Sequence, residues 1–351
     1  MPEPSPSRPP IGSLAIIAIV VAVGAGAFAY TAGWLSPTRL TPAKIVDSLA
    51  PPGGPSLGHR RNHAKGICFT GVFESNGAEL SSAQVFARGE YPALGRFNLA
   101  TADANAPDST VRVRGLGLQL STPDGEVWRS AMIDPPFFSV STPEGFYELQ
   151  LAAHSKDPNA MKAFVAGHLE FAPFAEWAKT APWTASYAEE TYNSLNSFIF
   201  VSGSGAEHAV RWSLLPQAQV VPITQEDLAK LGPNHLAQEI AERVAKAPQR
   251  WTMVVTVADP GDPTADPSTA WPPGRRAVEV GALVVQGIEG ERNGPCREIN
   301  FDPTILPNGV HVSDDPLPAA RSAAYARSYD LRTSELKYYP YHSEAAGGGE
   351  R

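Results

Sequence analysis

The chain has 351 residues, of which 43% are hydrophobic, and a formal net charge of −8 at pH 7. This length and apolar content are enough to bury a sizeable core, which excludes a wholly disordered chain. The acidic balance, without a dense basic patch, argues against a nucleic-acid partner.

The first predicted element is an apolar segment near the N-terminus. It runs from Ile11 to Leu35 without a charged residue, after a tail of residues 1–10. It exceeds the roughly 20 apolar residues that a bilayer span needs, so we expect an uncleaved transmembrane anchor. Arg8 precedes the segment and Arg39 and Lys44 follow it, so the positive charges leave its orientation open.

A cleaved signal peptide is the alternative interpretation of this segment, with Ala27, Phe28 and Ala29 as an A-x-A-like cleavage site. The apolar stretch is long for a signal peptide, which favours the anchor. In both cases we expect the rest of the chain to be exported. It would be held at the membrane with its folded domain on the periplasmic side, or secreted after cleavage.

The next segment has the composition of a linker. Residues 36–58 carry several prolines and glycines and few large apolar residues, with one short helix predicted at Pro42 to Leu49. We expect one globular domain over residues 59–340 and a flexible tail over 341–351.

The domain is predicted to be α+β, mainly antiparallel strands with helices inserted and appended. Residues 59–146 are strand-like, and an alternating run from Val111 to Leu120 meets a turn at Pro123 to Gly125 before its partner strand. Residues 158–180 predict a helical region. One helix is predicted from Thr224, its capping residue, to Ala247. Further strands are predicted at 196–202, 208–216, 250–260 and 276–287.

Cys68 and Cys296 are the only cysteines. Two cysteines are too few for a disulfide-rich scaffold or a zinc site, and neither lies in a CxxC pair. We therefore expect both to be buried, unreactive thiols.

The last predicted helix follows an aspartate pair at 314–315, which can cap it. Arg321, Tyr325, Ser328 and Arg332 recur along it at intervals of four, three and four residues, so they share one face. Neighbouring guanidinium groups favour the phenolate form of a tyrosine, and a phenolate is a ligand for ferric haem iron. An amphipathic surface helix with a half-buried tyrosine is the alternative.

His63 stands at the start of a predicted buried strand, after two arginines. The segment Arg60-x-x-His63-Ala-Lys-Gly resembles the distal-histidine segment of haem catalases. The spacing Arg321-x-x-x-Tyr325, continued to Arg332, resembles their proximal tyrosine helix.

Three further segments resemble the same family in the same order along the chain. "GRFNLATA" resembles the segment that carries a haem-propionate arginine, here Arg96, and "DPPFFSV" matches the distal phenylalanines with Phe137 and Phe138. "REINFDPTILPNGV" resembles the approach to the proximal helix. Each motif is weak alone, but five in order over most of residues 60–332 are a specific signal.

The chain departs from the catalase pattern at several positions. Met132 and Ile133 replace an asparagine pair, Asn98 replaces a serine, and residues 326–328 replace a Pro-Asp-Thr sequence. Only 26 residues follow Tyr325, so the long C-terminal helical region of catalases is missing here. The chain therefore resembles the short, membrane-anchored group called catalase-related peroxidases.

This resemblance implies a closed antiparallel β-barrel with flanking helices and one haem b. Tyr325 would be the iron ligand and His63 the proton shuttle for peroxide. The other residues expected to contact the cofactor are Arg60, Arg96, Phe137, Phe138, Arg321 and Arg332. The expected activity is reduction of hydrogen peroxide or organic hydroperoxides by a small organic electron donor, with weak catalase activity at most.

The sequence does not indicate an oligomeric state. Two other functions remain open at this point. Some catalase-like proteins rearrange fatty-acid hydroperoxides, and a hydroperoxide isomerase would keep the same fold and haem. A non-enzymatic haem-binding protein is the second alternative. His63 argues against it, because a haem carrier needs no proton shuttle.

Overall fold

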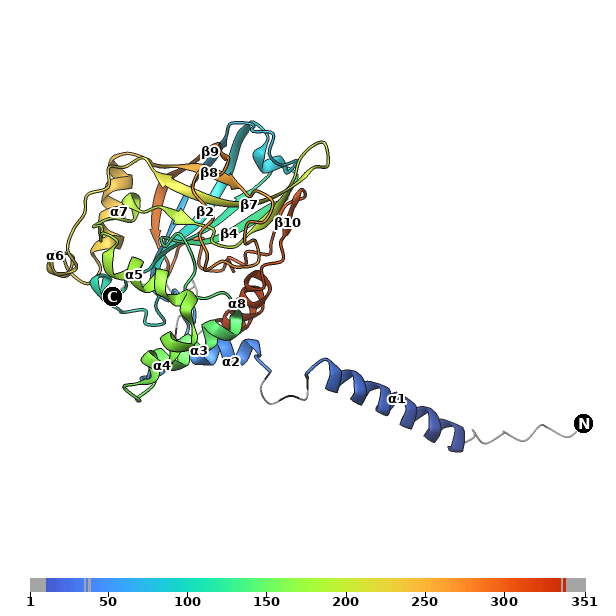
Figure 1. Ribbon diagram of the computed structural model, residues 1–351. Coiled ribbons are helices and arrows are strands. Elements are labelled where there is room, and N and C mark those ends of the chain that lie inside the picture. Colours follow the sequence, from blue (N-terminus) through green and yellow to red (C-terminus); the bar gives the residue numbers. More distant parts are fainter. Residues whose placement is uncertain (1–10, 35, 37–38, 336, 339–351) are drawn as a thin grey trace, which may run out of the picture. The chain divides into compact units, whose positions relative to one another are not determined.

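The computed structural model describes residues 11–34, 36, 39–335 and 337–338 (Figure 1). The tails expected at 1–10 and 341–351 lie outside the described residues. The chain divides into two compact units between Thr41 and Pro42. The smaller unit contains helix α1, Ile11–Thr31.

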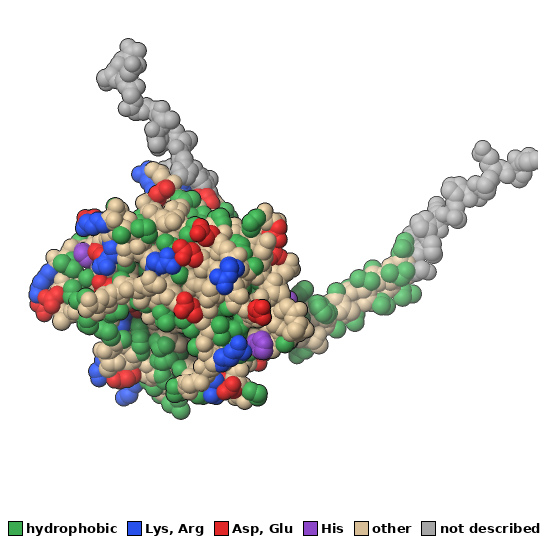
Figure 2. Space-filling model, turned by 90° about the horizontal axis from the view of Figure 1, so that it is seen from above, with side chains coloured by type: hydrophobic (Ala, Val, Ile, Leu, Met, Phe, Trp, Pro, Cys, Tyr) green, Lys and Arg blue, Asp and Glu red, His purple; other side chains and the backbone are tan. Residues whose placement is uncertain are grey.

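Helix α1 agrees with the predicted apolar segment. Residues Leu14–Thr31 have a mean hydropathy of 2.3 and form a helix long and apolar enough to cross a membrane. Its surface is almost entirely hydrophobic, whereas charged side chains are scattered over the visible face of the larger unit (Figure 2). A signal sequence near an N-terminus can also pass this test of length and composition, so the helix is compatible with both predictions.

The larger unit is built on an antiparallel sheet that closes on itself. In the described part of the chain the strands follow the order β10-β6-β7-β5-β4-β3-β2-β1-β9-β8, and β7 also pairs with β8. That last pairing closes eight strands into a barrel and leaves β6 and β10 as an extension, which confirms the predicted fold. The strands are β1 Gly66–Ser75, β2 Gly89–Leu99, β3 Arg114–Ser121, β4 Val127–Ile133, β5 Tyr192–Asn193, β6 Phe198–Val201, β7 Glu207–Pro216, β8 Gln249–Val257, β9 Ala277–Gly290 and β10 Val310–Val312.

The barrel interior is packed with aromatic rings. Phe97 on β2 stacks on Tyr187 at 5.3 Å between ring centroids and lies 5.6 Å from Trp251 on β8. Gly95 leaves room for the Phe69 ring, because a Cβ atom at that position would lie 2.1 Å from it. Inward-facing rings of this size fill an eight-stranded barrel, so a binding site for a large ligand is expected outside the barrel core.

Several helices gather beyond one end of the barrel (Figure 1). They include α2 Pro42–Ser48, which contacts both α3 Pro143–Ala153 and the C-terminal helix α8 Leu317–Ser334. Helices α4 Ala160–Gly167 and α5 Ala172–Thr180 form the predicted helical region. The sequence placed α2 in a linker, but its Ile45 and Val46 side chains are buried in the larger unit.

The single helix predicted from Thr224 to Ala247 is wrong, because the structure has two. They are α6 Gln225–Lys230 and α7 His235–Lys246. Between them Gly232 has a φ of 107°, and Pro233 follows with no N–H to donate. The predicted cap is present, since the Thr224 hydroxyl accepts a hydrogen bond from the Asp227 N–H at 3.0 Å.

The prediction of two thiols is also wrong, because Cys68 and Cys296 form a disulfide. Both residues are fully buried, as expected. Strand β1 pairs with β9, and this pairing brings Cys68 next to the segment that follows β9. The two cysteines are 228 residues apart, so their sequence positions alone gave no sign of the contact.

Candidate active site

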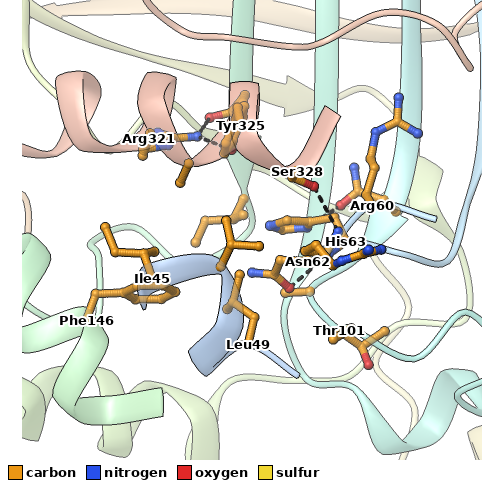
Figure 3. A pocket seen from close by; sticks show the side chains of 18 of the residues that line it. Ile45, Leu49, Arg60, Asn62, His63, Thr101, Phe146, Arg321, Tyr325 and Ser328 are labelled. Carbon is orange, nitrogen blue, oxygen red and sulfur yellow. Dashed lines mark hydrogen bonds between the residues drawn. The ribbon is translucent and has the colours of Figure 1, made fainter. Parts of the chain in front are cut away.

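A cavity of about 480 Å³ lies between the end of the barrel and helices α2, α3 and α8. Figure 3 shows Tyr325 and Arg321 on α8, with Ile45, Leu49 and Phe146 across the cavity from them. The structure places most of the predicted site residues in its wall: Arg60, His63, Arg96, Phe138, Arg321, Tyr325 and Arg332. Phe137 is the exception, since it is half-buried and is not among the lining residues.

His63 is held in the cavity wall by its ring and by its backbone. Its Nδ1 lies 2.6 Å from the side-chain oxygen of Asn98 on β2. A carbonyl oxygen can only accept, so Nδ1 carries the proton and Nε2 is left as a free base. Burial and the nearby Arg96 lower the pKa of His63 to about 4, against the opposing effect of the Asn98 hydrogen bond. The imidazole is therefore neutral at neutral pH.

The backbone of His63 has an uncommon left-handed conformation, with φ of 55°. Three hydrogen bonds fix it. The His63 N–H donates to the Asn62 side chain at 2.9 Å, the Arg96 guanidinium donates to the His63 carbonyl at 2.8 Å, and the Ala64 N–H donates to the Thr101 carbonyl at 2.7 Å. Surrounding contacts of this kind are needed to keep a non-glycine residue in this region.

Elsewhere in the cavity wall, Arg321 on α8 binds the hydroxyl group of Tyr325. An Arg321 N–H donates to the Tyr325 hydroxyl oxygen at 3.1 Å, and another donates to the Ala131 carbonyl at 2.9 Å. Arg321 and Tyr325 therefore lie on the same face of α8, as their spacing predicted. Ser328, one turn further along α8, accepts a hydrogen bond from the Arg61 N–H at 3.0 Å, which ties the histidine segment to the tyrosine helix.

The arginines at the cavity edge surround a carboxylate, Glu291, which the sequence did not single out. Arg60 forms an ion pair with one Glu291 oxygen, and Arg96 pairs with the other at 2.6 Å. Burial alone would raise the pKa of Glu291, but Arg96 and Arg60 lower it to about 2. Arg60 also donates to the carbonyls of Cys296, Arg297 and Ile299, at 3.1, 3.3 and 2.9 Å.

Two guanidinium groups in the cavity wall, those of Arg96 and Arg332, keep an unused donor. Among the described residues, the Arg96 Nε and one Arg332 terminal nitrogen are buried without a hydrogen-bond partner. Unpaired buried donors are costly unless a ligand supplies the acceptor. Because both residues line the cavity, they suit an anionic group such as a haem propionate. The apolar wall, with Leu116, Met132 and Phe146, suits the flat ring. The cavity therefore fits the implied cofactor.

The sequence missed three features of this site. The contact of Asn98 with His63 depends on the pairing of β1 with β2. The position of Glu291 depends on the pairing of β1 with β9. The cavity wall formed by α2 depends on tertiary packing of a seven-residue helix. The Arg-x-Asn sequence at 96–98 did carry a weak signal, because residues two apart on a strand face the same side.

The chain is similar to known proteins along most of its length. A family model described as Catalase matches residues 22–338. A catalase-related peroxidase of Synechococcus elongatus is 32% identical over 92% of this chain and 96% of its own length. One from Mycolicibacterium paratuberculosis is 31% identical over 84% of this chain and 95% of its own length.

Larger catalases share the fold at lower identity. Catalase-1 of Arabidopsis thaliana is 24% identical, and the match covers 65% of it. The solved structure of catalase A from Saccharomyces cerevisiae superposes with a TM-score of 0.70 at 18% identity, over 80% of this chain and 62% of that one. This chain therefore spans about two thirds of the length of these larger proteins.

Proposed function

Because the chain belongs to the catalase family, we propose that it is a haem-dependent peroxidase with weak catalase activity at most. It reduces hydrogen peroxide or an organic hydroperoxide with electrons from an organic donor. The observation that carries this proposal is the pairing of His63 with Asn98, which leaves a neutral base inside the cavity that also holds Tyr325.

The haem is b-type and is held by groups already described. Tyr325 is its iron ligand, with its oxygen held by Arg321. The unpaired donors of Arg96 and Arg332 bind the propionates, and Phe138 contacts the ring. When bound, the haem, through its iron and its porphyrin ring together, would supply the two electrons that split the O–O bond of the peroxide.

The protein's own contribution on the distal side is proton transfer. The free Nε2 of His63 takes the proton from one peroxide oxygen and returns it to the other, which leaves as water or alcohol. This requires a neutral imidazole, and its low pKa provides one. Asn98 keeps the proton on Nδ1, so the ring presents the same nitrogen in every cycle.

Met132 favours peroxidase over catalase activity. Its side chain is buried and lines the cavity where catalases carry an asparagine. A thioether is a poor substitute for an amide donor, so a second peroxide molecule loses a group that would orient it. An organic donor then returns the electrons to the enzyme.

We place the enzyme at the membrane, with α1 as the anchor and the haem domain on the periplasmic side. The apolar helix supports an anchor. The Cys68–Cys296 disulfide supports an oxidising compartment, because disulfides are rare in the cytosol.

The proposal is tested with the purified full chain in detergent. We expect a haem absorption spectrum that changes when hydrogen peroxide is added, and faster oxidation of an organic donor than release of oxygen. A chain without haem absorption, or with oxygen release as its main activity, would contradict it.

A further inference from the structure

Glu291 lies immediately after strand β9, and only 10% of its side chain is exposed. Its two oxygens bind Arg60, from the loop before β1, and Arg96, from β2. Both arginines line the cavity, but Glu291 does not. The carboxylate therefore stands behind the two guanidinium groups, on the side away from the cofactor site.

The segment 291–299 supports the arginines in a second way. Its backbone carbonyls bind Arg60, and the Arg297 carbonyl accepts a hydrogen bond from Arg332 at 2.6 Å. The disulfide between Cys296 and Cys68 fixes this segment to β1. Arg96 is also held by the carbonyls of His63 and Ala64. The orientation of the arginines therefore does not depend on Glu291 alone.

The charges around Glu291 match those of the proposed cofactor. Arg60, Arg96 and Arg332 carry three positive charges, and Glu291 reduces the net charge of this group to two. A haem b has two propionates. Arg61 and Arg297 have carboxylates of their own, since Arg61 pairs with Glu335 and Arg297 pairs with Glu298. Glu298 also acts on Arg332, so including the Arg297–Glu298 pair leaves the net charge of this group at two.

We propose that Glu291 is an internal counter-anion that stabilises the arginine group before haem binds. This inference rests on the proposed function. In the haem-free protein the carboxylate compensates two buried guanidinium groups, so the domain folds without its cofactor. In the loaded protein it opposes the propionates and weakens haem binding. Glu291 thereby stabilises the haem-free fold at the expense of affinity for haem.

The test is Glu291→Gln in the full chain, which removes the charge and keeps the size of the side chain. The haem-free variant should unfold at a temperature lower by roughly 5–10 °C, because two buried arginines lose their anion. Haem should pass from the loaded variant to excess apomyoglobin about fivefold more slowly. Two unit charges 4 Å apart interact by about that factor in water, and the lower effective dielectric constant of a protein site extends an effect of this size to larger separations.

Two variants serve as controls. Glu291→Asp keeps the charge and should restore the rate of haem release toward that of the wild type. Glu289→Gln removes the same charge from an exposed position two residues earlier and should change neither measurement.

A purely structural role for Glu291 predicts a different pattern, in which the Gln variant loses stability and releases haem faster. That result would overturn the proposal, and so would unchanged stability of the haem-free variant. Failure of the wild type to bind haem would instead refute the proposed function, while the unfolding temperatures would still report on the role of Glu291.

Discussion

His63 owes its chemical properties to its surroundings. A free histidine has a pKa near 6.5 and is partly charged at neutral pH. Here burial and the positive charges of Arg96, Arg321 and Arg60 favour the neutral form, and Asn98 fixes which nitrogen carries the proton. His63 is therefore a base that stays neutral in mildly acidic solution.

The first prediction concerns pH. A general base is lost when it becomes protonated, so the rate of reaction with peroxide should stay constant from pH 8 to about 5. It should fall as the pH approaches the His63 pKa of about 4. Stopped-flow measurements of the haem spectral change across this range check it. A decline centred on pH 6.5 would show a solvent-exposed histidine instead.

The second prediction is that His63→Ala keeps its haem but reacts with peroxide more slowly by about 10²–10⁴. In the proposed function His63 acts on the peroxide and is not an iron ligand, so cofactor retention should not suffer. His154→Ala is a matched control, because this histidine also lines the cavity but bonds the Ser48 carbonyl. Equal rates in wild type and His63→Ala would mean that His63 is only a packed histidine.

The third prediction concerns Tyr325. Tyr325→Phe removes one oxygen and keeps the ring, so packing should change little. The variant should lose most of its haem or show an altered ferric spectrum, because the proposed iron ligand is removed. Haem content and absorption spectra measure this. Near-stoichiometric haem with an unaltered spectrum would refute the assignment.

At the scale of the elements, helix α2 lies in a segment that was predicted to be a linker, but tertiary packing makes it part of the folded domain. A stretch of seven residues with two neighbouring branched side chains carries too little periodicity to be recognised as part of a core. In the structure Val46 is 2% exposed and lines the cavity next to Ile45. Helix α2 is therefore part of the site.

The fourth prediction follows from this packing. Val46→Ala should lower the free energy of unfolding by about 2 kcal/mol, because two buried methyl groups are lost and a cavity remains. Val165→Ala on α4 is the control, since that valine is 41% exposed and should change stability by less than about 0.5 kcal/mol. Urea unfolding of both variants measures the difference. Equal effects would show that α2 is not packed as described.

The elements also show which features of the fold could be predicted from local sequence patterns. Alternation predicted the β3–β4 hairpin, and spacing predicted the face of α8, because both depend on local periodicity. The break at Gly232 and Pro233 was equally local but was overlooked. The positions of Asn98, Glu291 and the disulfide depend on which strands become neighbours in the barrel. Local patterns do not show which strands become neighbours; the spacing of Arg96 and Asn98 indicates only that the two side chains face the same side of their strand.

At the scale of the molecule, the described chain separates between Thr41 and Pro42. The fifth prediction is that removing residues 1–40 gives a soluble protein that keeps its haem and its unfolding temperature. Removing residues 1–49 should lower that temperature, because it also deletes α2. Loss of haem from the shorter truncation would show that the N-terminal segment belongs to the core.

The position of the disulfide also limits when it can form. Its cysteines are 228 residues apart, and they meet only when β1 pairs with β9. During synthesis the first cysteine must therefore wait, unpaired, until the ninth strand has been made. Pairing over such a separation is slow to form. A thiol-alkylating reagent added during oxidative refolding would label chains in which β1 and β9 have not yet come together, so the unlabelled fraction would report the progress of this pairing.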